Sequence, residues 1–381
     1  MSNRVKSRPL SEYFSKLKDR RIQAKCLHEF LDLIMIVTCA TIAGADDFVA
    51  IEAFAQAKEA WFRDRLGLKL PNGIPTHDTY NRLFATIRPE EFHACFLDWV
   101  RDRSGDAKVP LIPIDGKTMR GSKRKTESGA CKAVHVVSAW ASAEGLTLAQ
   151  VKTDEKSNEI TAIPQLLKLL DVEGALVSID AMGCQKDIAA QVVAQKGDYL
   201  LAVKDNQPRL LADVQRLAED ALEAEYVGLS TRLLEELSHG RQEMRFCYVI
   251  QDLSSIRDLS DWPKLRSVVV VVSSRCDGNK QTDEVRYYIS SRKASAKTFL
   301  EAIRNHWSIE NQCHWVLDVA FREDDHRLRE GHGPANMSLM RKIVLAMLKN
   351  ADAECGIKNR RLKAGWDLDY LEQVLRGFAE D

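Results

Sequence analysis

The 381-residue sequence predicts an α/β protein built around a mixed five-stranded sheet with helices packed on it. Three observations support this fold class. Apolar residues recur at helical spacing from 10 to 100, three strand-like segments follow one another closely from 111, and strand and helix patterns alternate from 175 to 225. The three successive strands predict an antiparallel meander, and the alternating part adds parallel strands through right-handed crossovers.

The first part of the chain, 1–105, predicts a helical N-terminal domain. Helical spacing runs through 27–43 and 48–66, and Thr76 or Asp78 can cap a further helix. Such short helices form either a DNA-reading helix-turn-helix or an ordinary small bundle, and the sequence leaves both readings open.

The N-terminus is basic although the whole chain carries no net charge. Residues 1–25 hold eight Lys or Arg side chains against Glu12 and Asp19, a net charge of +6, whereas the full sequence has 55 basic and 55 acidic residues. The balanced total argues against a general nucleic-acid coat. The first 25 residues are therefore either a solvated leader or an arm that contacts phosphates.

The central region alternates strands and helices. Expected strands are 111–118, 133–142, 146–153, 175–181 and 198–204, and expected helices are 159–171, 185–196 and 208–225. Residues 229–291 then predict a β-rich insertion, and Asp277-Gly278-Asn279-Lys280 predicts a hairpin turn within it. We therefore expect a catalytic core from 106–228 and 292–381, interrupted by the insertion.

Two of the core strands carry an aspartate in the same sequence context, Asp115 within the first strand and Asp180 at the carboxyl end of the fourth. Asp115 in I-P-I-D-G-K and Asp180 in L-V-S-I-D-A-M-G each follow a short apolar run and precede a small residue. If the strands are parallel neighbours, about 4.8 Å apart, the two carboxylates face each other. Like charges that close require a proton or a cation, and Mg²⁺ prefers carboxylate oxygens. Each Asp could instead cap the turn that follows it.

A third acid is expected on the helix that begins near 296. Glu310 lies between two tryptophans, and Asp318 follows eight residues later, about 80° away in direction at 100° per residue. Both side chains cannot point equally well into one site. Periodicity favours Glu310 and leaves Asp318 as the rival. His306 and His314 lack a second ligand pair at the spacing that zinc would need.

Nine cysteines without a C-x-x-C pair predict reduced thiols, and hence a cytoplasmic protein rather than a disulfide framework. The apolar stretch 33–45 is too short to cross a bilayer and predicts a buried helix. We therefore expect no membrane partner.

Several longer motifs together resemble one family. They are I-D-G-K-T-M-R-G-S, K-S-N-E-I-T-A-I-P, I-D-A-M-G-C-Q-K-D-I-A, G-D-Y-L-L-A-V-K-D-N-Q, H-G-R-Q-E, H-W-S-I-E-N-Q-C-H-W-V-L-D-V-A-F-R-E-D and G-P-A-N-M-S-L-M-R-K. In this order they resemble the insertion-sequence transposases of the H-repeat-associated, ISAs type, over nearly the whole chain.

The resemblance implies a DDE transposase with an RNase-H-like catalytic core. It assigns the three acids to Asp115, Asp180 and Glu310, which would hold two Mg²⁺ ions, with Mn²⁺ as a substitute. It also implies cleavage of double-stranded DNA at element ends, joining to target DNA, a homodimer on DNA, and a cytoplasmic location on the bacterial nucleoid.

The sequence departs from broader relatives around Glu310. Those relatives carry Tyr, Arg and Lys seven residues before, four before and seven after this Glu. Here the positions hold Ile303, His306 and Leu317. Arg304 is the nearest substitute for the arginine, although its direction on an ideal helix differs by about 200°.

Residues near the acids are candidates for DNA contacts. The predicted loop after the first strand carries basic side chains that suit a phosphate backbone, namely Lys117, Arg120, Lys123, Arg124 and Lys125. Arg304 and Trp307 lie one to two turns before Glu310, where Trp307 could stack on an unpaired base or belong to the core.

Two other functions remain open from the sequence. A transposase relic would bind DNA without cutting it, and a stand-alone metal-dependent nuclease would cut DNA without joining ends. Short inverted repeats flanking the coding sequence would favour the transposase over the nuclease.

Overall fold

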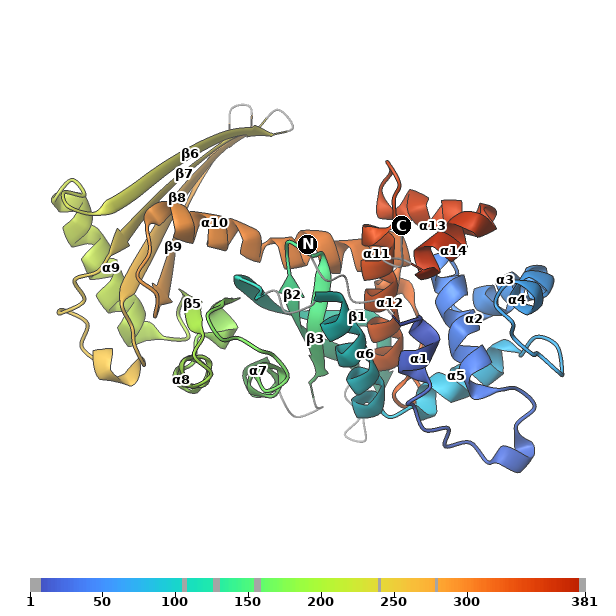
Figure 1. Ribbon diagram of the computed structural model, residues 1–381. Coiled ribbons are helices and arrows are strands. Elements are labelled where there is room, and N and C mark those ends of the chain that lie inside the picture. Colours follow the sequence, from blue (N-terminus) through green and yellow to red (C-terminus); the bar gives the residue numbers. More distant parts are fainter. Residues whose placement is uncertain are drawn as a thin grey trace, which may run out of the picture.

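A computed structural model describes residues 8–104, 108–125, 131–153, 159–238, 241–277 and 280–376. Its centre is a nine-stranded sheet in the order β3-β2-β1-β4-β5-β9-β8-β7-β6 (Figure 1). The strands are β1 (Leu111–Lys125), β2 (Cys131–Ala141), β3 (Leu146–Lys152), β4 (Leu176–Ile179), β5 (Asp198–Val203), β6 (Ser230–Ser238), β7 (Arg241–Ile250), β8 (Ser267–Asp277) and β9 (Lys280–Ser290).

The first five strands form the mixed sheet that the sequence predicts. β1 pairs antiparallel with β2, and β2 with β3, while β4 lies parallel between β1 and β5. All four residues of β4 are buried. A parallel strand covered on both faces lacks the alternation of apolar and polar residues, and the mostly apolar L-V-S-I accordingly lies between two other strands inside the sheet.

The β-rich insertion extends this sheet instead of forming a separate one. β9 pairs antiparallel with β5 from Leu200↔Ser290 to Val203↔Tyr287, and β8, β7 and β6 follow outward. The sheet therefore has nine strands, not five. β6 was not predicted, since S-T-R-L-L-E-E-L-S lacks a regular apolar alternation. At the predicted hairpin turn, Asp277 pairs with Lys280, while 278–279 lie outside the described residues.

Helices cover the inner five strands and build the other end of the molecule (Figure 1). They are α1 (Leu10–Phe14), α2 (Phe30–Ile42), α3 (Phe48–Ala57), α4 (Glu59–Asp64), α5 (His77–Thr86), α6 (Pro89–Ser104), α7 (Glu159–Leu167), α8 (Lys186–Ala194), α9 (Pro208–Glu223), α10 (Ala296–His306), α11 (Trp315–Phe321), α12 (Gly333–Asn350), α13 (Ile357–Trp366) and α14 (Leu368–Arg376). A π-helical turn, Glu310–His314, precedes α11.

The N-terminal helices pack on the C-terminal helix α12. Asn336 of α12, which is buried, donates hydrogen bonds to the carbonyl oxygens of Phe84 (2.8 Å) and Ile87 (3.0 Å) at the end of α5. α5 buries Tyr80, as the sequence predicts, but Thr76 at its start makes no side-chain capping bond. The predicted helical domain therefore shares one hydrophobic core with the C-terminal helices.

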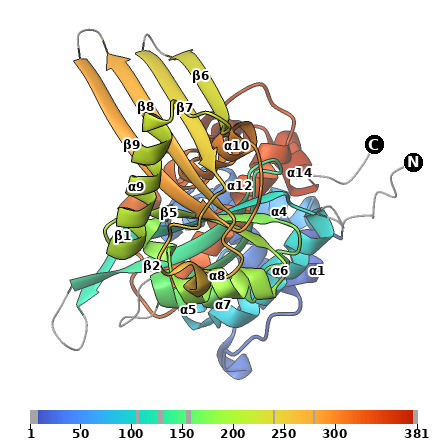
Figure 2. The ribbon, with the colours of Figure 1, turned by 90° about the vertical axis from the view of Figure 1, so that its left-hand side faces the viewer.

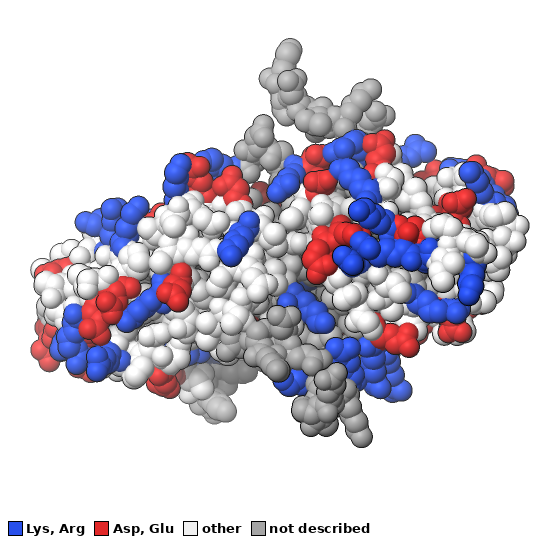
Figure 3. All heavy atoms as spheres, turned by 90° about the horizontal axis from the view of Figure 1, so that it is seen from below, with Lys and Arg blue, Asp and Glu red and all other residues white. Residues whose placement is uncertain are grey.

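The basic N-terminal segment lies against acidic side chains of α6. Arg8 contacts Asp102 at 2.6 Å, Lys16 contacts Asp98 at 2.5 Å, and Arg20 pairs with Glu91. Three of the basic side chains between 8 and 25 are thus paired with acidic residues of the same chain. Basic and acidic side chains are likewise interspersed on the face shown in Figure 3, outside its grey regions.

None of the helices in the described ranges combines the length and the apolar character that crossing a bilayer requires.

Candidate active site

The two aspartates meet at the centre of the sheet. The last printed pair of the parallel β1–β4 ladder is Ile114↔Ile179, so Asp115 and Asp180 occupy the next level on adjacent strands. Strands at this spacing lie about 4.8 Å apart, and facing residues in parallel register point to the same side. The sequence prediction that these strands are neighbours is therefore confirmed.

Asp180 both ends its strand and caps the turn after it. Its Oδ1 accepts hydrogen bonds from the backbone N–H groups of Met182 (3.1 Å) and Gly183 (3.3 Å). Burial, followed by the charges of Glu159 and Asp115, raises the pKa of Asp180 above its usual value. One oxygen of the Asp180 carboxylate thus caps the turn, as one of the two interpretations of the sequence predicted. Nearby negative charge disfavours the ionised form of the carboxylate.

Glu310 lies at the start of the π-helical turn and lines the same cavity as Asp180. The cavity has a volume of about 270 Å³ and is also lined by Ser178, His306 and Trp307. Burial and then the charge of Asp115 raise the pKa of Glu310, and Asp180 adds a smaller effect in the same direction. Arg286 lowers this pKa but does not cancel the increase. The wider turn breaks the spacing of 100° per residue from which we compared Glu310 with Asp318. Isolated π turns of this kind occur frequently at functional sites.

Two histidines line this region from the helical side. The Nδ1 atom of His314 lies 3.2 Å from Oδ2 of Asp115, and Nδ1 of His306 lies 2.9 Å from the Ser178 hydroxyl. Burial opposes ionisation of Asp115, yet His314 and then His306 hold the pKa of this carboxyl below its usual value. Asp115 is therefore ionised where Asp180 and Glu310 are disfavoured as anions.

The donor chemistry of the three acids fits a hard divalent cation. Carboxylate oxygens are the ligands that Mg²⁺ prefers, and positive charge would offset the repulsion that raises two of the three pKa values. As placed, the described residues contain no group of three His, Cys, Asp or Glu side chains close enough to hold a metal ion. The residue types therefore suit a divalent cation, whereas the side chains as placed are too far apart to coordinate one together.

Glu159 is an acid near this site that sequence reasoning missed. Its Oε1 lies 2.9 Å from Nε2 of His135, and the other ring nitrogen of His135 lies 2.8 Å from the Thr118 hydroxyl. A Cβ added to Gly116 would come within 2.2 Å of the same Glu159 oxygen, so the carboxylate lies over the backbone directly after Asp115. A signal existed, because Glu159 belongs to the K-S-N-E-I-T-A-I-P motif.

The predicted basic loop after the first strand is wrong. β1 continues through Lys125 and pairs with β2, with an irregularity between Met119 and Arg124. Met119 is buried and Arg120 exposed, an alternation that suits a half-buried strand. Arg120 and Lys123 remain exposed, Arg124 is half-buried, and the side chain of Lys125 lies outside the described part.

Lys117, which we expected to approach the DNA phosphates, is buried and paired with acidic side chains. It is 7% exposed, and its Nζ lies 2.6 Å from Asp318, 3.2 Å from Glu323 and 3.5 Å from Asp324. Burial lowers the pKa of this amine, but the three carboxylates more than offset it and raise the pKa. Asp318, the rival candidate for the third acid, therefore forms an ion pair with the buried ammonium group of Lys117.

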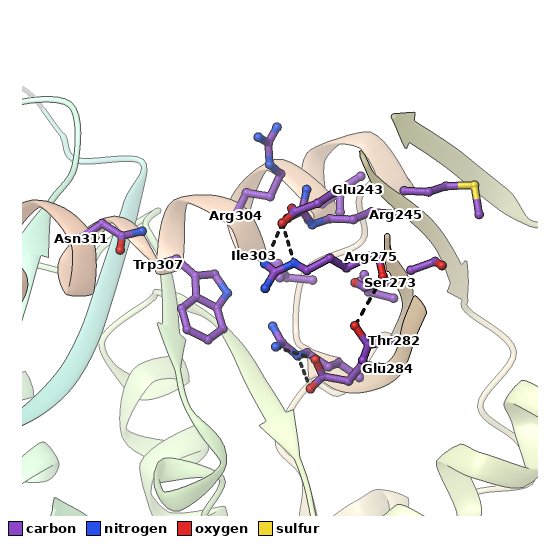
Figure 4. Close-up of a pocket in the computed structure, with 15 residues that line it drawn as sticks. Glu243, Arg245, Ser273, Arg275, Thr282, Glu284, Ile303, Arg304, Trp307 and Asn311 are labelled. Carbon is purple, nitrogen blue, oxygen red and sulfur yellow. Dashed lines mark hydrogen bonds and ion pairs between the residues drawn. The ribbon is translucent and has the colours of Figure 1, made fainter. Parts of the chain in front are cut away.

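Arg304 and Trp307 line a second cavity that adjoins the first (Figure 4). This cleft of about 450 Å³ lies between α10 and one face of β7–β9, and Arg245, Arg275 and Arg286 line it too. Arg304 pairs with Glu236 at 2.6 Å, and the Arg286 guanidinium lies 5.0 Å from the ring centroid of Trp307. The two cavities share four lining residues, Glu284, Arg286, Ile303 and Trp307.

Comparison with protein families identifies the chain. Residues 107–347 match the family model "Transposase DDE domain", and residues 11–100 match the model "DDE_Tnp_1-associated". The chain belongs to the DDE transposase family. The RNase-H-like fold class that the motifs implied is thus confirmed, together with the mixed inner sheet.

Relatives in this family extend over almost the entire chain. The H repeat-associated putative transposase YhhI of Escherichia coli (strain K12) is 39% identical over 97% of this chain and 98% of its own length. The putative transposase YncI of Escherichia coli O157:H7 is 40% identical, covering 97% and 95%. A solved piggyBac transposase synaptic complex with hairpin DNA aligns over 95% of this chain and 78% of its own, with 9% identity and a TM-score of 0.43.

Proposed function

We propose that this DDE-family protein is an active DNA transposase, which cuts and joins DNA strands by cation-dependent phosphoryl transfer at Asp115, Asp180 and Glu310. The observation that carries the proposal is that Asp115 and Asp180 hold adjacent positions on neighbouring strands, and that Glu310 is near enough for both of their charges to raise its pKa. A purely structural set of acids would more often be neutralised by Lys or Arg, as Asp318 is by Lys117.

The three acids would hold two Mg²⁺ ions, with Mn²⁺ able to replace them. Such ions, when bound, make water or a DNA 3′-hydroxyl a better nucleophile and stabilise the leaving oxygen of an in-line displacement. The protein supplies the carboxylates in fixed places. Asp115 is kept ionised by His314, while Asp180 keeps one oxygen on the backbone of its own turn.

DNA would approach along the cleft that adjoins the carboxylate cavity. Arg275 and Arg304 on its walls have side chains that are 55% and 42% exposed, and Trp307 is 39% exposed. Cations of this kind contact phosphates, and an exposed indole can stack on an unpaired base. Arg120, Lys123 and Arg124 on the outer part of β1 are further candidates for phosphate contacts. The same function implies DNA element ends and target DNA as partners, and a homodimer that brings two ends together.

The test is strand cleavage and joining in vitro on DNA carrying the inverted repeats that flank the coding sequence. With Mg²⁺ or Mn²⁺, the wild-type protein should nick these ends and join them to target DNA. Asp115→Asn, Asp180→Asn and Glu310→Gln should each abolish strand cleavage while the fold persists. Asp205→Asn, an exposed carboxylate after β5, is the matched control.

The outcomes separate the competing functions. Nicking without joining would indicate a stand-alone nuclease, and tight binding without any cleavage would indicate a relic. Full cleavage by Glu310→Gln would show that another group serves as the third acid.

A further inference from the structure

Strand β1 meets the π-helical turn and the helix α11 that follows it through two successive pairs of side chains. Asp115 lies beside His314 at 3.2 Å, and Lys117 lies beside Asp318 at 2.6 Å. Asp115 and Lys117 are two residues apart and therefore project from the same face of the strand.

The spacing of the two pairs matches on both elements. Two strand residues advance the chain by about 6.6 Å, and four helical residues advance it by about 6 Å. His314 and Asp318 are four apart, so they present the same side of the helix one turn apart. A slip of one residue along the helix would turn its side chains by about 100° and lose both contacts.

The Lys117–Asp318 pair has more charged neighbours than the Asp115–His314 pair. Lys117 also contacts Glu323, a fully buried carboxylate that lies 3.5 Å from Arg341 of α12. Beyond it, the backbone N–H of Arg120 donates to Asp324 at 3.0 Å. Burial opposes ionisation of Glu323, but the charges of Lys117, Arg341 and Lys342 hold its pKa to about 2. The network is therefore charged at neutral pH.

We propose that Lys117 and Asp318 are positioning residues, which set the register of the α11 helix on β1 so that Glu310 and Asp115 serve one cation site. This inference rests on the proposed function, because it assigns the two acids to the same reaction. Neither side chain of the pair lines the cavity that Asp180 and Glu310 share.

The role of Asp318 differs from that of a third acid and from that of a stability contact. A third acid would be required for any cation binding. If Asp318 only adds stability, its substitution would lower the melting temperature and leave unchanged the cation concentration that gives half the maximal rate. If Asp318 is a positioning residue, its substitution would shift this cation concentration while the protein stays folded and bound to DNA.

The experiment uses the full-length protein and the variant Asp318→Asn, with Asp325→Asn as the matched control. Asp325 is the exposed acid seven residues on, which pairs with Arg322 instead of with β1. Binding of Mn²⁺ to the free protein is measured by electron paramagnetic resonance, and single-turnover cleavage is measured against Mn²⁺ concentration. DNA affinity is measured without divalent cation.

We expect Asp318→Asn to weaken Mn²⁺ binding about tenfold and to lower the maximal rate 10- to 100-fold, within the range that misplaced reacting groups produce. DNA affinity should change less than about twofold, and Asp325→Asn should behave as wild type. Lys117→Met, which keeps the alkyl stem, should follow Asp318→Asn where it folds. If Asp318→Asn binds Mn²⁺ like wild type, the positioning role is excluded.

Failure of the proposed function gives a different result. In that case the wild-type protein binds no Mn²⁺ in a manner that depends on Asp115 and Glu310, whatever Asp318→Asn does. Loss of all Mn²⁺ binding in Asp318→Asn, with none lost in Glu310→Gln, would make Asp318 a ligand and overturn both assignments.

Discussion

The inner and outer halves of the nine-stranded sheet are built differently. The inner strands β1, β4 and β5 are covered by helices and bury nearly every apolar side chain, whereas β6 exposes Leu233 and Leu237, 49% and 80% accessible. Figure 2 shows the four outer strands fanning away from the rest of the molecule.

Charged side chains also differ between the halves. The inner half keeps Glu323, Lys117 and Arg341 in a buried network, while the outer half pairs exposed groups such as Arg275 with Glu243. Buried charges interact strongly and are costly to unpair, and exposed pairs contribute about 0–1 kcal/mol. The inner half is therefore suited to holding acids in fixed places, and the outer half to exchanging its own ion pairs for those of a partner.

The largest difference should appear when one charge is removed from each half. Glu323→Gln leaves Lys117 and Arg341 with less compensation and should cost about 3 kcal/mol of unfolding free energy at pH 7. Glu284→Gln, an exposed partner of Arg286, should cost less than about 1 kcal/mol. Urea unfolding of both variants measures the contrast.

The same pair makes a prediction about pH. The folded pKa of Glu323 is depressed to about 2, so its ionisation stabilises the fold above the unfolded pKa near 4.5. This contribution is lost as the pH falls from there through about 2. The gap between wild type and Glu323→Gln should therefore close over this interval. A gap that stays constant with pH would contradict the depressed pKa.

Truncating one leucine in each half tests the contrast in burial. Leu201 on β5 is fully buried and Leu237 on β6 is 80% exposed. Leu201→Ala should cost about 2–5 kcal/mol, the range for cavities in well-packed cores, and Leu237→Ala should stay within about 0.5 kcal/mol. Equal shifts of the urea midpoint would show that β6 is covered in solution.

A glycine substitution tests how closely β1 approaches the turn after α11. A Cβ at Gly121 would lie 2.4 Å from the His326 carbonyl oxygen and 2.6 Å from that of Asp324. Because backbone cannot rotate away like a side chain, Gly121→Ala should cost about 1–3 kcal/mol. Gly356→Ala, which meets nothing within 4 Å, is the control. Thermal unfolding of the two variants decides the point.

The smallest effect on stability should come from the cleft of the outer half. Arg275→Ala and Arg304→Ala together should leave unfolding within about 0.5 kcal/mol, yet weaken DNA binding and flatten its salt slope by about 1 per arginine. Arg209→Ala, an 82% exposed arginine on α9, should leave the salt slope unchanged. An unchanged slope in the double variant would place the DNA elsewhere.

Much of the inner half could be predicted from local patterns. The runs before Asp115 and Asp180 identified two central strands, and helical periodicity placed Tyr80 inward on α5. The family followed from motifs that lie within short segments. Each of these features depends on neighbours a few residues apart, so the sequence carries them directly.

The assignments that failed depend on partners far along the chain. From its sequence neighbours alone, Lys117 looks like one basic residue among several. Its burial and ion pairing depend on Asp318, Glu323 and Asp324, which lie about 200 residues later in the chain. Helical spacing measured from Glu310 was misleading, because a π-helical turn intervenes.

The sequence by itself determined the two aspartates on neighbouring core strands, the order of most helices and strands, and the family. The tertiary structure decided which side chains of the outer strands stay exposed, how the insertion joins β5 through β9, and where Glu159 and Lys117 lie relative to the acids. The physical reason is that periodicity and turn chemistry act over a few residues. Register between distant segments is selected by burial and charge pairing, which appear only when those segments pack together.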